Sequence, residues 1–227
     1  MNIPVRHVRW TTCCRLIPTR YSEDDILKKV ADPEDMKSVA ELEQMTDERL
    51  RQERGDVSFI RPDDFVAGPG SEYVAAAFAY RNPEGSRFSD GAFGVYYAAH
   101  ALSTAVEEAK HHRQVFMSRT KESPMQLEMV VLAADLDGHL HDIRGMRKKI
   151  PQIYSPTNYA ASQELAFKLF KDLSFGIVYE SVRHKRGHCV AVFRPPVLNR
   201  CRQQGLIIFE WDGKVIKKTY ELHEYTD

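Results

Sequence analysis

The sequence lacks the features that define several large protein classes. Its 227 residues include four cysteines, at positions 13, 14, 189 and 201, and none has a CxxC or other zinc-binding spacing. Adjacent Cys13 and Cys14 are poor disulfide partners for each other, so we expect reduced thiols and a cytoplasmic protein. The first ten residues contain no apolar signal-peptide core, and the longest apolar runs are far shorter than the roughly 20 residues that span a bilayer. These absences argue against a disulfide scaffold and predict no membrane segment.

An excess of charge of one sign is also missing. Lysine and arginine number 32, as do aspartate and glutamate, so the formal net charge is zero. A strongly basic surface is the usual signature of a protein that binds nucleic acid directly. We therefore expect no direct contact with nucleic acid, while the possibility of a homo-oligomer is left open by the sequence.

Several catalytic motifs are absent as well. The sequence has no HExxH, GxSxG, Walker A or GxGxxG pattern. One Glu-x-x-His occurs, from Glu108 to His111, but carboxylate-bridged metal sites need two copies. His139 and His141 flank an expected turn and lack an obvious third ligand. We predict no metal site and no resident cofactor.

The pattern of elements that is present predicts an α+β fold. Regions with helical or strand character do not alternate regularly, which disfavours a doubly wound sheet. The Asp212-Gly213 pair between two β-rich segments predicts a hairpin. The expected helices cover about 71–80, 101–117 and 158–172, and the expected strands cover 94–99, 127–136 (ended by a turn at Asp137-Gly138), 175–181, 189–193 and the hairpin 205–222.

The N-terminal part has a different composition. Between Ser22 and Asp56 there are twelve acidic and six basic residues, with apolar residues at helical spacing and capping residues at Ser22 and Thr46. We interpret residues 22–56 as an acidic helical extension. The sequence thus predicts an N-terminal segment, 1–80, and a catalytic core, 81–227, to which the segment around Arg15 can also belong.

The adjacent glutamates Glu107 and Glu108 differ in their expected surroundings. Leu102, Ala105, Val106, Ala109 and Phe116 form the apolar face of the helix that carries them. At about 100° per residue, Glu107 points away from this face and Glu108 lies on its flank. The flank position favours Glu108 as a carboxylate beside a cleft.

The stretch GSRFSDGAFGVYYAAHALSTAVEEAKHH, followed much later by GIVYESVR and FRPP, resembles the RES domain family. The resemblance covers about Gly85 to Pro196 and is weaker towards the N-terminus. By this match the family's arginine, tyrosine, glutamate and serine correspond to Arg87, Tyr97, Glu108 and Ser181. A further family arginine corresponds to Arg15, and Phe88 stands where many members have tryptophan.

The resemblance implies a fold like that of ADP-ribosyltransferases, with mixed sheets and flanking helices. It also implies a toxin of a bacterial toxin–antitoxin pair that is neutralised by a helix-turn-helix antitoxin. Members consume NAD as a substrate and release nicotinamide by hydrolysis, phosphorolysis or transfer of ADP-ribose to a protein. A protein-directed ADP-ribosyltransferase and a catalytically silent module that only binds a partner are the alternatives.

The residue types suit this chemistry. Cleavage of the bond between nicotinamide and ribose creates an oxocarbenium-like centre, which the Glu108 carboxylate can stabilise. The guanidinium of Arg87, helped by Arg15, can bind the NAD diphosphate in a bidentate manner. Tyr97 can stack on nicotinamide or hydrogen-bond a ribose. Ser181 is interpreted as a hydrogen-bonding residue to the ligand or to Glu108, and not as a nucleophile.

Overall fold

The computed structural model describes residues 3–19 and 60–223, so the acidic helices predicted within residues 22–56 lie outside the described residues. In the described part, seven strands form one mixed sheet and three α-helices pack against it. The α+β fold class is therefore confirmed. The strands are β1 (Val5–Pro18), β2 (Tyr96–Ala99), β3 (Met125–Asp142), β4 (Gly176–Glu180), β5 (His188–Val192), β6 (Leu198–Trp211) and β7 (Ile216–Leu222). The helices are α4 (Ser71–Ala79), α5 (Leu102–Ser118) and α6 (Ala160–Lys171), with short 3-10 turns η4 (Pro62–Asp64), η5 (Pro151–Tyr154) and η6 (Pro195–Val197).

The sheet closes partly on itself. Its strand order is β1-β2-β5-β4-β3-β6-β7, and β1 also pairs with β3. The first five strands thus form a ring of paired neighbours, from which β6 and β7 extend outward. All pairings are antiparallel except β3 with β4. Strand β1, which carries Arg15, pairs with β3 from Val5 to Pro18, so it is part of the same sheet as the strands after residue 80. The division of the chain near residue 80 stays a prediction.

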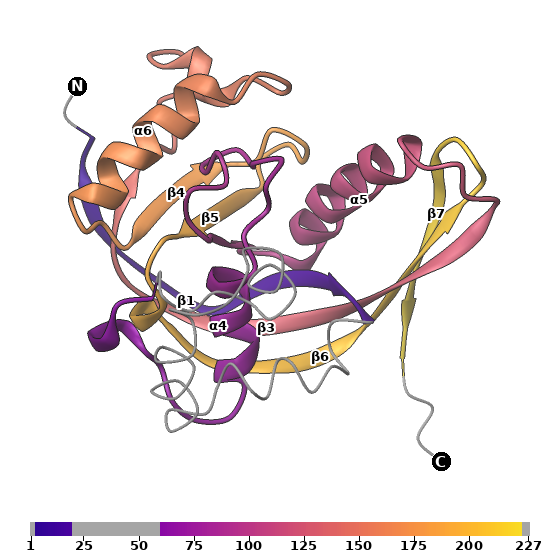
Figure 1. Ribbon diagram of the computed structural model, residues 1–227, viewed down its shortest axis with the longest axis horizontal. Helices are drawn as coiled ribbons and strands as arrows, with labels where there is room; N and C mark the ends of the chain where they lie inside the picture. Colours follow the sequence, from indigo (N-terminus) through magenta and orange to yellow (C-terminus); the bar gives the residue numbers. More distant parts are fainter. Residues whose placement is uncertain (1–2, 20–59, 224–227) are drawn as a thin grey trace, which may run out of the picture.

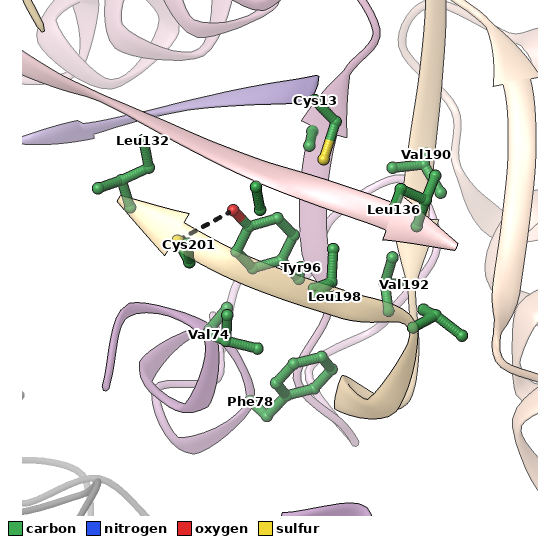
Figure 2. Packing of buried hydrophobic residues seen from close by; sticks show 14 of the residues in the cluster. Cys13, Val74, Phe78, Tyr96, Leu132, Leu136, Val190, Val192, Leu198 and Cys201 are labelled. Carbon is green, nitrogen blue, oxygen red and sulfur yellow. Dashed lines mark hydrogen bonds between the residues drawn. The ribbon is translucent and has the colours of Figure 1, made fainter. Parts of the chain in front are cut away.

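The helices lie on two faces of this sheet. Helix α4 packs against one face, whereas α5 and α6 lie on the other (Figure 1). The side chains on the α4 face alternate along β3, from Val130 and Leu132 to Leu140, as the two-residue period of a strand requires. Val74 and Phe78 of α4 pack on this face beneath Tyr96 and Leu198 (Figure 2). None of the helices in residues 3–19 and 60–223 is both long enough and apolar enough to cross a membrane.

The predicted turn at Asp137-Gly138 is wrong. Strand β3 continues through both residues, which pair with Arg9 and Val8 of β1. Glycine is required at 138 by close packing, because a Cβ there would lie 2.3 Å from Cγ1 of Val197. The partner strand and the packing of η6 thus override a dipeptide that favours turns. His139, which was expected beside the turn, instead lies in the strand with its ring 5.1 Å from that of His7.

Other expected elements are confirmed, with shifts at their ends. The hairpin forms between β6 and β7, but its loop covers the four residues from Asp212 to Val215, and the Asp212 carboxylate accepts hydrogen bonds from the backbone N–H groups of Lys214 and Val215. Helix α4 begins at Ser71, which lies inside the helix, and Gly70 precedes it with φ of 80°. Strand β1 was not predicted from the sequence.

Candidate functional site

The site begins on one stripe of α5. Thr104, Glu108 and His112 are four residues apart, so they lie one above the other on the same side of the helix. The loop between β4 and β5 packs along this stripe. Thr104 Oγ1 and His184 Nδ1 lie 2.8 Å apart, and a Cβ at Gly187 would lie 2.6 Å from Cγ2 of Thr104. This close packing brings the end of β4, with Ser181, onto the helix.

Glu108 is held by two neighbours from the sheet. Ser181 Oγ donates a hydrogen bond of 2.6 Å to Oε1 of Glu108, and the thiol of Cys189 lies 3.9 Å from the same oxygen. Ser181 Oγ also accepts hydrogen bonds from the backbone N–H groups of Arg183 and His184, so its proton is directed to the carboxylate. Within the described residues, Oε2 of Glu108 has no hydrogen-bond partner. Glu107 is exposed, and Glu108 is only partly so, as the helical spacing predicts.

Arg87 is a buried cation, with 8% of its surface exposed. Its Nη1 donates to the carbonyl oxygens of Ile153 at 3.1 Å and Ser155 at 2.9 Å, and its guanidinium lies 4.7 Å from the centre of the Tyr159 ring. The contacts all come from η5 and the loop that follows it. They fix one edge of the guanidinium, and the remaining nitrogens have no hydrogen-bond partner among the described residues.

Tyr97 positions the segment that carries Arg87. Its hydroxyl lies 2.7 Å from Ser86 Oγ and accepts a 2.9 Å hydrogen bond from the backbone N–H of Phe88. Desolvation raises the pKa of Tyr97 to about 12, although its side chain is partly exposed, so it stays protonated at neutral pH. Gln163 of α6 adds hydrogen bonds to the carbonyl oxygens of Ser86 and Ser89. The Arg87 segment is therefore held from both β2 and α6.

The structure brings four of the predicted residues around one buried centre. Desolvation raises the pKa of Tyr179 well above its usual value, and the neighbouring charges of Glu108 and Arg87 act on it with opposite signs. Glu108 also raises, and Arg87 lowers, the pKa of Cys189, whose largest shift comes from burial. Glu108 and Arg87 thus lie close enough to influence both Tyr179 and Cys189, Tyr97 influences Tyr179, and Ser181 bonds directly to Glu108.

Arg15 is the predicted site residue that is not part of this group. It alternates with Cys14 and Leu16 along β1, so its side chain lies on the α4 face of the sheet. Its guanidinium lies 4.9 Å from the centre of the Tyr96 ring, and its Nη1 donates a 3.3 Å hydrogen bond to the backbone carbonyl of Tyr97. In the described part of the chain it contacts none of Arg87, Glu108 and Ser181. Its direct contacts support the backbone of β2.

Sequence reasoning missed several residues of the site. Arg183 donates hydrogen bonds from Nη2 to the carbonyl oxygen of Pro156 and, at 3.5 Å, to the hydroxyl of Tyr159. His112 is exposed, yet desolvation followed by the charges of Arg183, Arg87 and Arg113 lowers its pKa to about 4. The four-residue spacing from Glu108 to His112 was the one signal that could have indicated this histidine. Arg183 and Tyr159 become neighbours only through the tertiary fold.

A separate hollow of about 690 Å³ lies elsewhere on the molecule and includes none of the predicted site residues. It is lined by Pro4, Arg6, Asp142, Arg144, Gly145, Met146, Lys149, Glu180 and His188. Its buried carboxylate, Asp142, is occupied by two hydrogen bonds from the Arg144 side chain and an ion pair with Arg6. Among residues 3–19 and 60–223, no group of three or more histidine, cysteine or carboxylate side chains is arranged to hold a metal ion.

Comparison with known proteins agrees with the motifs that the site contains. The family model of the RES domain matches residues 65–212. The uncharacterized protein y4oC of Sinorhizobium fredii is 30% identical over 209 residues, which cover 91% of this chain and 85% of that protein. Among solved structures, the M. tuberculosis MbcT-MbcA toxin-antitoxin complex aligns over 92% of this chain and 87% of the matched chain, with a TM-score of 0.45 and 10% identity.

Proposed function

This chain belongs to the RES domain family, and we propose that it cleaves the bond between nicotinamide and ribose in NAD, as the toxin of a bacterial toxin–antitoxin pair. The observation that carries the proposal is the hydrogen bonding of the Glu108 carboxylate. One carboxylate oxygen is fixed by Ser181, while the other has no partner among the described residues. A fixed carboxylate with one free oxygen can act on a bound substrate without first breaking a bond to the protein.

The proposed reaction uses this geometry. The C–N bond between nicotinamide and ribose breaks, and its electron pair moves onto the pyridinium nitrogen, which becomes neutral. The ribose is left with oxocarbenium character, which the negative charge of Glu108 stabilises. An acceptor oxygen from water or inorganic phosphate then bonds to the same carbon and loses its proton. Arg87 binds the diphosphate with the nitrogens that the protein leaves unpaired, and Tyr97 holds the Arg87 segment in place.

A toxin of this kind needs a partner that silences it. We propose a helix-turn-helix antitoxin, because the family resemblance implies one. We then expect NAD depletion to inhibit growth when the chain is produced without the antitoxin. No other chain is needed to complete the group of Glu108, Ser181, Arg87 and Tyr97, since all four come from one chain.

The proposal is tested by incubating purified full-length protein with NAD and measuring nicotinamide release, with and without inorganic phosphate. We expect release by the natural chain and a product, ADP-ribose or its 1-phosphate, that reveals the acceptor. ADP-ribose attached to protein would instead support an ADP-ribosyltransferase. A folded protein that binds NAD weakly or not at all and releases no nicotinamide would reject the proposal in favour of a partner-binding module.

A further inference from the structure

Two guanidinium groups, those of Arg87 and Arg183, contact a single tyrosine, Tyr159. Arg87 lies over the ring of Tyr159 at 4.7 Å, and Arg183 donates to the hydroxyl of the same residue. Both arginines also bond to carbonyl oxygens of one short segment: Arg87 to Ile153 and Ser155, Arg183 to Pro156. The Tyr159 side chain therefore contacts one cation with its ring and the other with its hydroxyl.

Neither cation is neutralised by the described protein. No carboxylate in residues 3–19 and 60–223 forms an ion pair with Arg87 or Arg183, whereas Arg194, which is partly buried like Arg183, is paired with Asp64. The neighbouring histidines carry no negative charge, and desolvation and both arginines lower the pKa of His111 and His112, which disfavours a further positive charge beside the two guanidinium groups. Two like charges that contact one tyrosine and have no ion-pair partner among the described residues repel each other, and a bound anion reduces that repulsion.

The geometry points to Arg183 as a second guanidinium of the substrate site, which binds the diphosphate of the dinucleotide together with Arg87. This inference rests on the proposed function, because it takes NAD as the ligand. Each arginine uses one terminal nitrogen, Nη1 in Arg87 and Nη2 in Arg183, for the protein contacts. The other nitrogens of each planar group are left for phosphate oxygens, and two adjacent phosphates match two adjacent cations.

The arrangement also gives Arg183 a link to the reacting centre. Its backbone N–H donates a 3.0 Å hydrogen bond to Ser181 Oγ, which in turn donates to Glu108. The β4–β5 loop therefore holds a bound diphosphate at a fixed position relative to the Glu108 carboxylate. A ligand without phosphate gains nothing from this residue, which makes Arg183 a determinant of specificity.

The test measures binding by calorimetry in the full-length Glu108→Gln protein, in which we expect turnover to be at least ~100-fold slower. The ligands are ADP-ribose, inorganic diphosphate and nicotinamide riboside, which lacks phosphate. We expect Arg183→Ala to weaken ADP-ribose and diphosphate binding roughly 10- to 100-fold, the loss typical of a charged hydrogen bond. Nicotinamide riboside binding should change by less than about twofold. Arg183→Lys should restore part of the affinity, and Lys185→Ala, an exposed cation in the same loop, is the matched control.

The outcomes separate this inference from the proposed function. If the starting protein binds ADP-ribose and Arg183→Ala binds it equally well, the inference is wrong and the NAD reaction stands. If Arg183→Ala weakens all three ligands equally, the residue is structural and the inference is again wrong. If the starting protein binds diphosphate through Arg183 but neither ADP-ribose nor nicotinamide riboside, the anion site stands and the proposed function fails.

Discussion

Two adjacent glutamates on α5 show how one residue step changes the chemistry of a side chain. A helix turns about 100° per residue, so Glu107 faces solvent while Glu108 turns toward the β4–β5 loop. There it receives a hydrogen bond from Ser181 and lies beside the buried thiol of Cys189. Burial, then the charge of Glu108, raises the pKa of Cys189, so the thiol stays protonated and is able to donate to the carboxylate.

Glu108→Gln should lower the rate of nicotinamide release at least ~100-fold, because it removes the charge that stabilises the cationic transition state while keeping the size of the side chain. Glu107→Gln is the matched control and should stay within a few-fold of the natural protein, since exposed substitutions usually have small effects. Both variants should keep the circular dichroism of the natural fold. A loss of turnover in Glu107→Gln with full activity in Glu108→Gln would reverse the assignment.

Strand β3 is the element that organises the sheet. It pairs with β1, β4 and β6, and it remains extended for 18 residues. Its length depends on Gly138, where η6 packs so closely that Val197 occupies the space of a side chain. The Asp142 carboxylate near the end of β3 then starts the loop toward η5, through its hydrogen bonds to the backbone and side chain of Arg144. The chain after Asp142 leads to η5 and to the carbonyl oxygens that contact Arg87.

Gly138→Ala should destabilise the fold by about 1–3 kcal/mol, the usual cost of forcing extra volume into a packed core. The measurement is chemical unfolding, with the midpoint compared at an unchanged slope. Gly205→Ala is the matched control, because the added Cβ would meet no atom within 4 Å and the residue does not have a positive φ. Combining Gly138→Ala with Val197→Ala should restore part of the stability, because the nearest clashing atom is then removed. An unchanged midpoint in Gly138→Ala would mean that η6 moves away freely.

At the scale of the whole molecule, burial lowers the pKa of four histidines. The pKa values of His111, His112, His141 and His188 are lowered, and desolvation is the largest cause for each. Their usual value is 6.5, and that of His112 falls to about 4. Between these values the unfolded chain binds more protons than the folded protein, so acid favours unfolding.

We therefore expect the melting temperature to fall as the pH is lowered from 7 to 5. The carboxylates with lowered pKa values, Asp142, Glu164 and Asp212, have usual values of 4.5 or less and contribute mainly at lower pH. His112→Gln should make the dependence on pH less steep in this range, since it removes the histidine with the pKa of about 4. Equal melting temperatures at pH 7 and pH 5 would contradict the expectation.

The sequence by itself determined the features that depend on local spacing. The apolar period of α5 predicted its position and separated Glu107 from Glu108, and the Asp212-Gly213 pair predicted the β6–β7 hairpin. The same reasoning placed Phe116 on the buried face, yet it is 51% exposed, and the next residue, Met117, is the one that packs on the sheet at that end of the helix. The short motifs around Arg87, Tyr97, Glu108 and Ser181 were also enough to identify the family.

Only the tertiary structure decided what depends on contacts between distant segments. The extended path of β3 through Asp137-Gly138 comes from pairing with β1, and the position of Arg15 on the α4 face comes from the register of that same pairing. Arg183 and Arg87 are 96 positions apart in the sequence, and they meet because Tyr159 lies between them in the fold. Local patterns do not encode such neighbours, since packing and strand pairing bring them together only when the whole sheet has formed.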